Sequence, residues 1–233
     1  VDYVKDQTRP FFLWLSIPDP HPPYMVCEPY RSMYKKNQVP SPAWREGEMM
    51  DKPYRQKLVV EWDRYGKEYP DDDILELRAK YLGMVSYIDT ELGKLMATLD
   101  ETGQTDNTIV VFSSDHGDYM GDHRMIRKGP HLYEALTHVP LIVRWPSKIA
   151  PKETDALVSN IDVMPTLAEL AGIPAFPGVE GRSFASVLLD ASTQPHREAV
   201  FMEHGDPGVA LQENELSQEN YDKLSDSTNH HLC

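Results

Sequence analysis

The apolar positions between residues 74 and 99 recur every three or four residues, which is the spacing of an amphipathic α-helix. Three aspartates, Asp71 to Asp73, precede this pattern, and Gly103 follows it. Carboxylates stabilise the N-terminal end of a helix, and glycine commonly follows the last turn. The pattern therefore predicts one helix of about seven turns between these two signals.

Short apolar runs elsewhere in the chain predict strands. Residues 11–17 (FFLWLSI), 108–114 (TIVVFSS) and 139–145 (VPLIVRW) are almost continuously apolar, as in strands that are buried on both faces, and residues 198–203 (EAVFME) predict one more strand. Residues 162–172 (DVMPTLAELAG) predict a short helix that ends at a glycine. Strands that alternate with helices predict an α/β fold with a mostly parallel sheet.

Two segments lack a steady period. Residues 31–70 are polar, contain prolines and are rich in Tyr and Trp, so we interpret them as a long loop or insertion. Residues 204–233 are polar and aperiodic, which predicts a loose C-terminal tail after a domain over residues 1–203.

Composition narrows the class of partner. The 233 residues carry 23 Lys and Arg against 37 Asp and Glu, a formal net charge of −14, which argues against a nucleic-acid partner. No apolar run approaches the roughly 20 residues of a membrane-spanning helix. The two cysteines, Cys27 and Cys233, predict neither a disulfide framework nor a CxxC metal site.

Charged and titratable side chains gather in residues 113–134. Asp115 and His116 follow directly after the strand-like run 108–114, and ligands gather at the carboxyl ends of strands in parallel α/β sheets. Gly117 allows a sharp turn, so that two adjacent side chains can reach one ion. We consider metal ligation by this pair alongside the alternative of an exposed loop turn.

A cationic segment follows within this otherwise acidic chain, formed by His123, Arg124, Arg127, Lys128 and His131. A cation site beside a cationic loop is what an anionic ester requires, because charge on its oxygens is stabilised by metal and ammonium together. The alternative is a solvated basic loop.

His21 stands in the sequence PDPHPPY, after the apolar run 11–17. Prolines on both sides favour a stiff, extended turn that can hold a side chain toward a reacting atom. A merely exposed histidine is the alternative.

Several of these motifs, in this order, resemble the sulfatase family of the alkaline-phosphatase superfamily. They are HPP after an apolar run, then residues 81–118 ending in SSDHGD, then GDHRMIRKGPHLYEALTHVPLIVRWP, then NIDVMPTLAELAGI and GRSF. The resemblance covers roughly residues 10–201. It implies an alkaline-phosphatase-like α/β sandwich, with a mostly parallel central sheet flanked by helices, of which this chain holds the second part as a partial catalytic domain.

The resemblance also implies site residues. Asp115 and His116 are similar to a pair of metal ligands of that family, Lys128 to the lysine that holds sulfate oxygens, and His21 to the histidine that contacts the sulfate and assists the leaving oxygen as general acid. The family uses a formylglycine nucleophile beside a divalent metal, usually calcium, with manganese or zinc as alternatives. Further polar residues are expected to shape the pocket without an assigned role: Asp118, Asp122, His123 and His131.

The chain departs from the family pattern near its start. The nucleophile motif C-x-P-x-R and an acidic metal pair precede the HPP histidine in the family, and nothing before His21 fits either. Cys27 to Arg31 reads CEPYR, but SMYKKNQVP follows instead of an apolar helix, so we interpret this match as accidental. We therefore expect uncovered strand edges and a pairing with the absent N-terminal part, or a homo-oligomer.

Three hypotheses follow. The first is a metal-dependent sulfuric ester hydrolase that acts on a small sulfated ester or sulfated sugar, exported or lysosomal as family members commonly are. The second is a phosphodiesterase or phosphonate hydrolase of the same superfamily, because His116 as a ligand suits manganese or zinc. The third is a non-catalytic, truncated sulfatase-like protein.

Overall fold

The computed structural model describes residues 1–53, 56–57, 71–129, 131–174, 177–190 and 195–203. The helices are α1 (Asp2–Lys5), α4 (Asp71–Glu101), α5 (Glu134–Thr137), α6 (Val163–Leu170) and α7 (Ala185–Leu188), and the strands are β1 (Val110–Ser113) and β2 (Leu141–Arg144). Short 3₁₀ turns join them, among them Tyr30–Ser32, Glu48–Asp51, Asp122–Arg124 and Asn160–Asp162.

Helix α4 confirms the long amphipathic helix and extends over 31 residues. Its buried positions include Ile74, Met84 and Leu99, whereas its first turn carries the three exposed aspartates. A Cβ at Gly83 would lie 2.4 Å from the carbonyl oxygen of Tyr30, so the missing side chain lets the Tyr30–Ser32 turn pack directly on the helix. The helix is thus the support on which the N-terminal loops rest.

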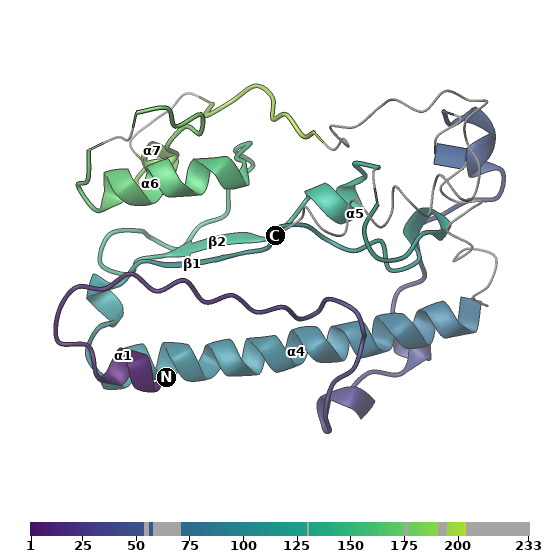
Figure 1. Ribbon diagram of the computed structural model, residues 1–233, viewed down its shortest axis with the longest axis horizontal. Helices are drawn as coiled ribbons and strands as arrows, with labels where there is room; N and C mark the ends of the chain where they lie inside the picture. The colour runs from purple at the N-terminus through teal and green to yellow at the C-terminus, as the bar shows by residue number, and fades with distance from the viewer. Residues whose placement is uncertain (54–55, 58–70, 130, 175–176, 191–194, 204–233) are drawn as a thin grey trace.

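The strands lie between helix layers, with α4 along one side and α6 and α7 along the other (Figure 1). Strands β1 and β2 pair antiparallel, with Val110 opposite Arg144 and Ser113 opposite Leu141. The parallel arrangement expected from the sequence is therefore wrong for this pair. Parallel neighbours need a crossover, usually helical, that returns the chain to the starting end of the sheet, whereas the described part of the connection from β1 to β2 holds the 3₁₀ turn Asp122–Arg124 and the four-residue α5 and turns the chain back.

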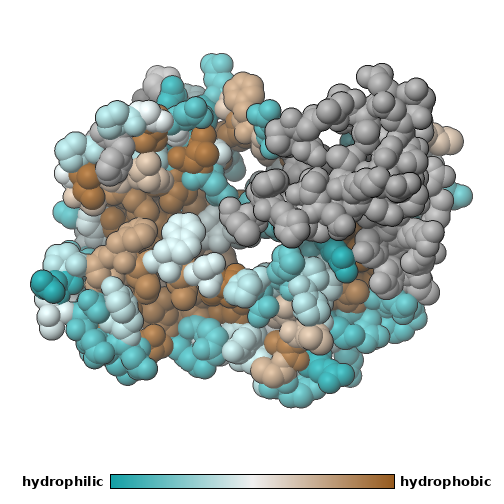
Figure 2. Space-filling model, in the orientation of Figure 1, coloured by the Kyte–Doolittle hydropathy of each residue, from teal (hydrophilic) through white to brown (hydrophobic). Residues whose placement is uncertain are grey.

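The apolar run 11–17 corrects a second expectation, because the structure assigns it no strand. It is extended, and Phe12 and Trp14 are 75% and 79% exposed. A strand requires a neighbour for its backbone N–H and C=O groups, and none of the described segments supplies one. Apolar surface is visible on the half of the molecule that holds the strands (Figure 2).

The segment before α4 runs along that helix. Gln104 Nε2, just beyond the C-terminal end of α4, donates to the Val4 carbonyl at 3.1 Å, and Tyr34 bonds Ser86 near the middle of the helix at 2.9 Å. Residues 198–203 are described without the strand that was expected. The expected loop over residues 31–70 is described only in part, and the expected tail over 204–233 lies outside the described residues.

The predicted short helix is confirmed as α6. Asp162, which precedes it, is fully buried and accepts hydrogen bonds from Ser159 N at 2.9 Å and Arg182 N at 2.7 Å. The Arg197 guanidinium binds both of its carboxylate oxygens. This network fixes the loop at Asn160, which contacts the end of β1.

In the part of the chain that the structure describes, no helix is long and apolar enough to cross a membrane.

Candidate functional site

The end of β1 is held in place by Asn160. Its side-chain amide donates to the Ser114 carbonyl at 2.9 Å, and its amide oxygen lies 3.2 Å from Ser113 Oγ. Ser114 Oγ in turn donates to the His116 carbonyl at 2.8 Å. The backbone is therefore pinned immediately before and after Asp115.

Asp115 and His116 face one another in this pinned turn. His116 Nε2 lies 3.6 Å from Asp115 Oδ2, and the Asp115 side chain is 87% exposed. His116 Nδ1 lies 2.7 Å from the Gly117 carbonyl, which can only accept a hydrogen bond. This contact assigns the hydrogen to Nδ1 in the tautomer that could bind a cation, and Nε2 is the ring nitrogen that lies toward the carboxylate.

Gly117 permits this turn because the chain passes very close to the loop before β2. Gly117 N donates to the Leu136 carbonyl at 2.9 Å, and a Cβ at this position would lie 1.9 Å from the Ala135 carbonyl oxygen. Real side chains do not approach a backbone atom so closely. Any larger residue must displace the loop that carries Asp115 and His116.

The loop of His21 is joined to the same region by Tyr24. Tyr24 Oη donates to Asp118 Oδ2 at 2.6 Å, and its ring packs edge-on against Tyr81 of α4, with centroids 6.2 Å apart. Burial, together with the hydrogen bond to Asp118, raises the pKa of Tyr24 well above its usual range, so the hydroxyl keeps its proton. His21 itself is exposed, and its Nδ1 lies 2.9 Å from the Pro22 carbonyl.

Lys128 follows a short backbone ladder that starts beside Asp118. Tyr119 N donates to the Arg127 carbonyl at 3.0 Å, and Gly121 N donates to the Met125 carbonyl at 2.7 Å. Lys128 is partly buried and has no hydrogen bond or ion pair with another residue of the described ranges. The ladder and the Tyr24 hydroxyl together bring the loops of His21, Asp115 and Lys128 into one part of the molecule.

The expected cationic cluster divides in the structure. Arg124 bonds Asp71 at 2.7 Å and lies over the Trp44 ring, 3.5 Å from its centroid, which is away from the Asp115 turn. His123 is paired with Glu48. The remaining expected pocket residues have structural contacts: Asp118 binds Tyr24, Asp122 binds Arg78 and Ala43 N, and His131 is buried and accepts from Tyr119 through its carbonyl.

The donor set at the end of β1 fits a divalent cation in part. Asp115 offers a carboxylate oxygen and His116 an imidazole nitrogen, both turned toward the same space. No group of three or more His, Cys, Asp or Glu side chains is arranged for a metal within the described residues. A cation at this turn would therefore find two donors in the described part of the chain, and a complete shell would need others.

Two positioning residues were missed by the sequence reasoning. Tyr24 stands three residues after His21, and Asn160 stands 45 positions after Asp115, and neither spacing marks a site. Both act through contacts between distant segments. Cys27 is exposed, and the residues after it form the Tyr30–Ser32 turn on α4 and not the helix expected after the nucleophile motif, which supports the interpretation of CEPYR as accidental.

Comparison with known proteins identifies the family to which this chain belongs. A family model described as sulfatase matches residues 1–173. The multifunctional alkaline phosphatase superfamily protein PehA of Trinickia caryophylli is 32% identical, over 86% of this chain and 42% of that protein. The arylsulfatase of Clostridium perfringens is 31% identical, over 88% and 43%.

Among solved structures, the phosphonate monoester hydrolase of Agrobacterium radiobacter superposes with a TM-score of 0.79 at 27% identity, over 94% of this chain and 47% of that one. This likeness confirms the expected α/β fold of the alkaline-phosphatase type, as a partial domain. The chain spans less than half the length of these relatives.

Proposed function

Because this chain belongs to the sulfatase family, we propose that the protein hydrolyses sulfate esters, and that this chain supplies part of the metal-binding and anion-binding side chains. The observation that carries the proposal is the facing pair at the end of β1, with 3.6 Å between His116 Nε2 and Asp115 Oδ2. The hydrogen bonds from Tyr24 to Asp118 and from Tyr119 to Arg127, made by neighbours of His21 and Lys128, support including these two residues. The relatives are more than twice as long, so the activity is proposed for the whole protein.

Asp115 and His116 would hold a divalent cation. The hydrogen bond from His116 Nδ1 to the Gly117 carbonyl, at 2.7 Å, fixes the ring orientation and leaves Nε2 as the donor. When bound, the cation supplies a Lewis acid that stabilises negative charge on the ester oxygens. The high exposure of the Asp115 carboxylate leaves its second oxygen accessible to such an ion.

Lys128 and His21 would act on the anionic ester itself. The Lys128 ammonium has no carboxylate partner within the described residues, so its charge is available to non-bridging sulfate oxygens. At His21, the contact of Nδ1 with the Pro22 carbonyl turns Nε2 outward. A protonated Nε2 can donate to the leaving oxygen as the ester bond breaks, which is general acid catalysis.

A second candidate is hydrolysis of phosphonate monoesters or phosphodiesters. Its support is the likeness to the phosphonate monoester hydrolase of Agrobacterium radiobacter and the imidazole donor of His116. A carboxylate and an imidazole suit Mn²⁺ or Zn²⁺, whereas Ca²⁺ prefers oxygen ligands alone. A sulfatase with Ca²⁺ and a phosphonate hydrolase with Mn²⁺ or Zn²⁺ are therefore distinguishable pairs of properties.

The test is a metal analysis of the intact, full-length protein combined with parallel assays. Release of 4-nitrophenol from its sulfate ester and from a phenylphosphonate ester is compared at equal concentrations. The leading proposal expects the sulfate ester to be cleaved with the higher kcat/KM. A preference for the phosphonate ester, with bound Mn²⁺ or Zn²⁺, establishes the second candidate instead.

A Lys128→Met variant shows whether the measured activity comes from this protein or from a contaminating enzyme. Methionine keeps much of the side-chain length but removes the charge, so we expect kcat/KM to fall about 100-fold, the effect of losing a preorganised electrostatic contact. Lys148→Met, an exposed lysine after β2, serves as the matched control. Equal activity of the two variants would refute the assigned role of Lys128, and no turnover by the wild type would refute both candidates.

A further inference from the structure

The loop that carries Lys128 is bounded by two aromatic rings that contact each other. The His123 ring stacks on the Tyr133 ring, with 3.8 Å between their centroids and 18° between their planes. Lys128 lies midway between them in the sequence. We call the described residues 124–129 and 131–132 the Lys128 loop, and the stacked pair of rings its neck. The stack therefore closes the loop at both of its ends.

The loop is also anchored to the core on either side of Lys128. Met125, before it, is buried, and Tyr119 Oη donates to the carbonyl of His131, after it, at 2.5 Å. The Tyr133 ring packs against the same core, with its centroid 6.3 Å from that of the Tyr119 ring. Tyr133 is thus the residue at which the neck meets the core.

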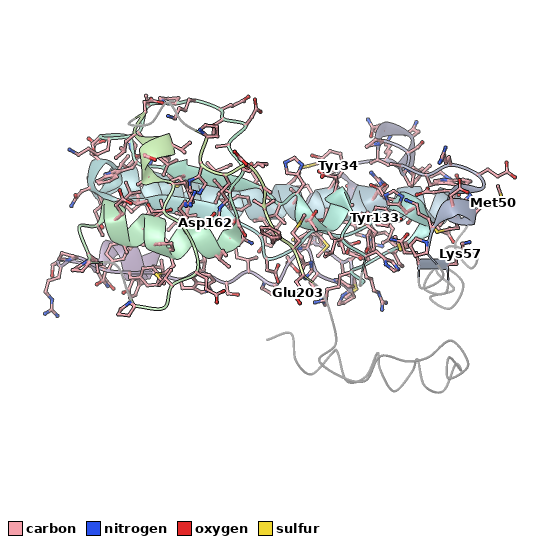
Figure 3. The ribbon with its side chains drawn as sticks, turned by 90° about the horizontal axis from the view of Figure 1, so that it is seen from above. Tyr34, Met50, Lys57, Tyr133, Asp162 and Glu203 are labelled. Atoms are coloured by element: carbon pink, nitrogen blue, oxygen red, sulfur yellow. The ribbon has the colours of Figure 1, made fainter. Side chains whose placement is uncertain are left out.

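A segment that has no part in the proposed chemistry lies against this neck. We call its described residues, 43–53 and 56–57, the strap. Three of its side chains contact the neck: Glu48 is paired with His123, Lys52 Nζ lies 5.2 Å from the centroid of the Tyr133 ring, and Gln56 Oε1 accepts from the Tyr133 hydroxyl at 3.4 Å. Met50 of the strap and Tyr133 lie in the same half of the molecule (Figure 3). The long excursion before α4 therefore reaches the loop of the proposed anion site.

The first residue of the strap is fixed to the backbone next to the neck. Ala43 N donates to Asp122 Oδ1 at 2.9 Å, and His123 N donates to the Ala43 carbonyl at 2.9 Å. Arg78 of α4 donates to the same Asp122 oxygen at 3.0 Å. The strap is therefore held at its start by reciprocal hydrogen bonds that the long helix supports.

The pair of Glu48 and His123 is the most enclosed of the contacts between strap and neck. The two side chains are 11% and 24% exposed, and a carboxylate with so little exposure requires a hydrogen-bond partner, which His123 provides. His123 has a φ of 55°, a conformation that non-glycine residues rarely adopt and that persists where surrounding contacts enforce it. Glu48 and the Ala43 carbonyl supply such contacts. Removal of the Glu48 carboxylate should therefore loosen the neck.

We propose that Glu48, His123 and Tyr133 are positioning residues through which the strap keeps the Lys128 loop closed, so that the Lys128 ammonium is held in place for an anion. Within the described residues Lys128 has no hydrogen bond or ion pair of its own, so its position depends on the backbone that carries it. Fixing both ends of a short loop restricts the conformations of the residues between them. The anion-binding role of Lys128 rests on the proposed function, whereas the closure of the loop stands by itself.

Backbone hydrogen exchange and sulfate binding in the full-length protein test the two parts separately. Glu48→Ala removes the acceptor for His123, and Tyr133→Leu removes the stacked ring. We expect either variant to speed the exchange of amides in the Lys128 loop by about tenfold, while exchange in α6 stays unchanged. The dissociation constant of inorganic sulfate, measured by NMR titration, should rise about tenfold, because a more mobile ammonium is less often in the orientation that binds the anion.

Each variant has a matched control. Glu46→Ala removes an exposed carboxylate two residues before Glu48, and Tyr133→Phe keeps the stacked ring while it loses the hydroxyl contact with Gln56. Both controls should leave the exchange of the loop and the sulfate affinity close to those of the wild type. In a Lys128→Met background, the Glu48→Ala change should cause no further loss of sulfate affinity, because its effect is transmitted through that ammonium.

The outcomes separate the closure of the loop from the proposed function. Exchange in the Lys128 loop that is equal in wild type and Glu48→Ala would overturn the role of the strap. Faster exchange with unchanged sulfate affinity, or a further tenfold loss of affinity on adding Glu48→Ala to Lys128→Met, would overturn the positioning of Lys128. Faster exchange in a protein that binds no sulfate and hydrolyses no ester would support the closure of the loop while refuting the proposed function.

Discussion

Asp162 and Asp115 carry the same side chain in opposite surroundings. Asp162 is fully buried beneath α6, where it receives hydrogen bonds from the backbone N–H groups of Ser159 and Arg182 and from the guanidinium of Arg197. The Asp115 side chain is 87% exposed and, among the residues that the structure describes, accepts a hydrogen bond from the N–H group of its neighbour at 3.0 Å alone. Figure 3 shows Asp162 within the half of the molecule that contains α6.

The difference separates a structural carboxylate from one that is available to a ligand. Burial alone would raise the pKa of Asp162, but the backbone hydrogen bonds from Arg182 and Ser159 and the charge of Arg197 together hold it below its ordinary value. All of its hydrogen-bonding capacity is used within the fold. Asp115 instead keeps an oxygen free that faces an imidazole nitrogen, an arrangement that gains stability when a cation is shared between them. Asn160 connects the two regions, because it follows Ser159 and binds Ser114.

Removal of the buried carboxylate should give the largest effect. Asp162→Ala leaves the Arg197 guanidinium and two backbone N–H groups without their acceptor, so we expect a loss of about 3–5 kcal/mol in the free energy of unfolding. Urea denaturation of the intact protein, followed by circular dichroism, measures this change. Asp155→Ala, at an exposed aspartate in the preceding loop, is the control and should change stability by less than about 0.5 kcal/mol. Similar losses in the free energy of unfolding for Asp162→Ala and Asp155→Ala would show that the buried carboxylate stabilises the fold no more than an exposed one.

Acid should weaken the same network by a smaller amount, because protonation keeps the Asp162 side chain in place. Its pKa is lowered in the folded protein, so its contribution is complete above the unfolded value of about 3.9 and is lost as the pH falls through the folded value. The contribution of this group to the urea midpoint should therefore stay level from pH 6 to about pH 4 and drop as the pH falls further, and the midpoint should drop by less in Asp162→Asn. The same drop in the variant would show that other carboxylates cause it.

Asp115→Ala should lower the activity strongly and the stability little, which is the opposite of the effect expected for Asp162→Ala. Loss of a metal ligand is expected to lower kcat/KM of the full-length protein about 100-fold, equivalent to about 2.7 kcal/mol, while the free energy of unfolding changes by less than about 0.5 kcal/mol. Metal content by mass spectrometry should fall in the same variant. If the loss of stability in Asp115→Ala accounted for its loss of activity, Asp115 would be a structural residue like Asp162.

The sequence predicted the elements whose signal is local. Helix α4 and helix α6 follow from periodicity and terminal residues, which act over one or two turns. The antiparallel pairing of β1 with β2 did not, because pairing direction depends on the path of the connection and not on the strand residues. Residues 11–17 read as a strand because they are apolar, but strand formation also requires a partner.

The geometry of the site was predicted where it depends on neighbouring residues, and it was missed where it depends on contacts between distant segments. The facing of Asp115 and His116 follows from adjacent positions around a glycine, and it is observed. The division of the cationic loop was not predictable, since Arg124 is drawn to Asp71 at the start of α4, more than 50 positions away. The roles of Asp115 and His116 in metal binding, and those of His21 and Lys128 in catalysis, stay predictions until the activity is measured.

Tyr24→Phe should have a moderate effect that tests how the His21 loop reaches Asp118. The variant removes one hydrogen bond to a carboxylate, of 2.6 Å, but keeps the ring against Tyr81, so we expect about 1.5 kcal/mol of lost stability. Since this bond links the two loops, kcat/KM should fall by more than the decrease in the fraction of folded protein explains. Tyr3→Phe, at an exposed tyrosine of α1, is the control. An unchanged kcat/KM would show that the loops are joined by other contacts.

The smallest expected effect comes from Gly93, which lies in α4 with no atom within 4 Å of the position of a Cβ. Gly93→Ala should stabilise the protein by about 0.5–1 kcal/mol, because alanine restricts the unfolded chain and favours the helix. It touches neither the Asp162 network nor the Asp115 turn, so kcat/KM should not change. Gly117→Ala is the informative partner, because its Cβ would collide with the Ala135 carbonyl and displace the turn itself. If activity rose with stability in Gly93→Ala, activity would be limited by folding, and the loss in Asp115→Ala could no longer be assigned to the site.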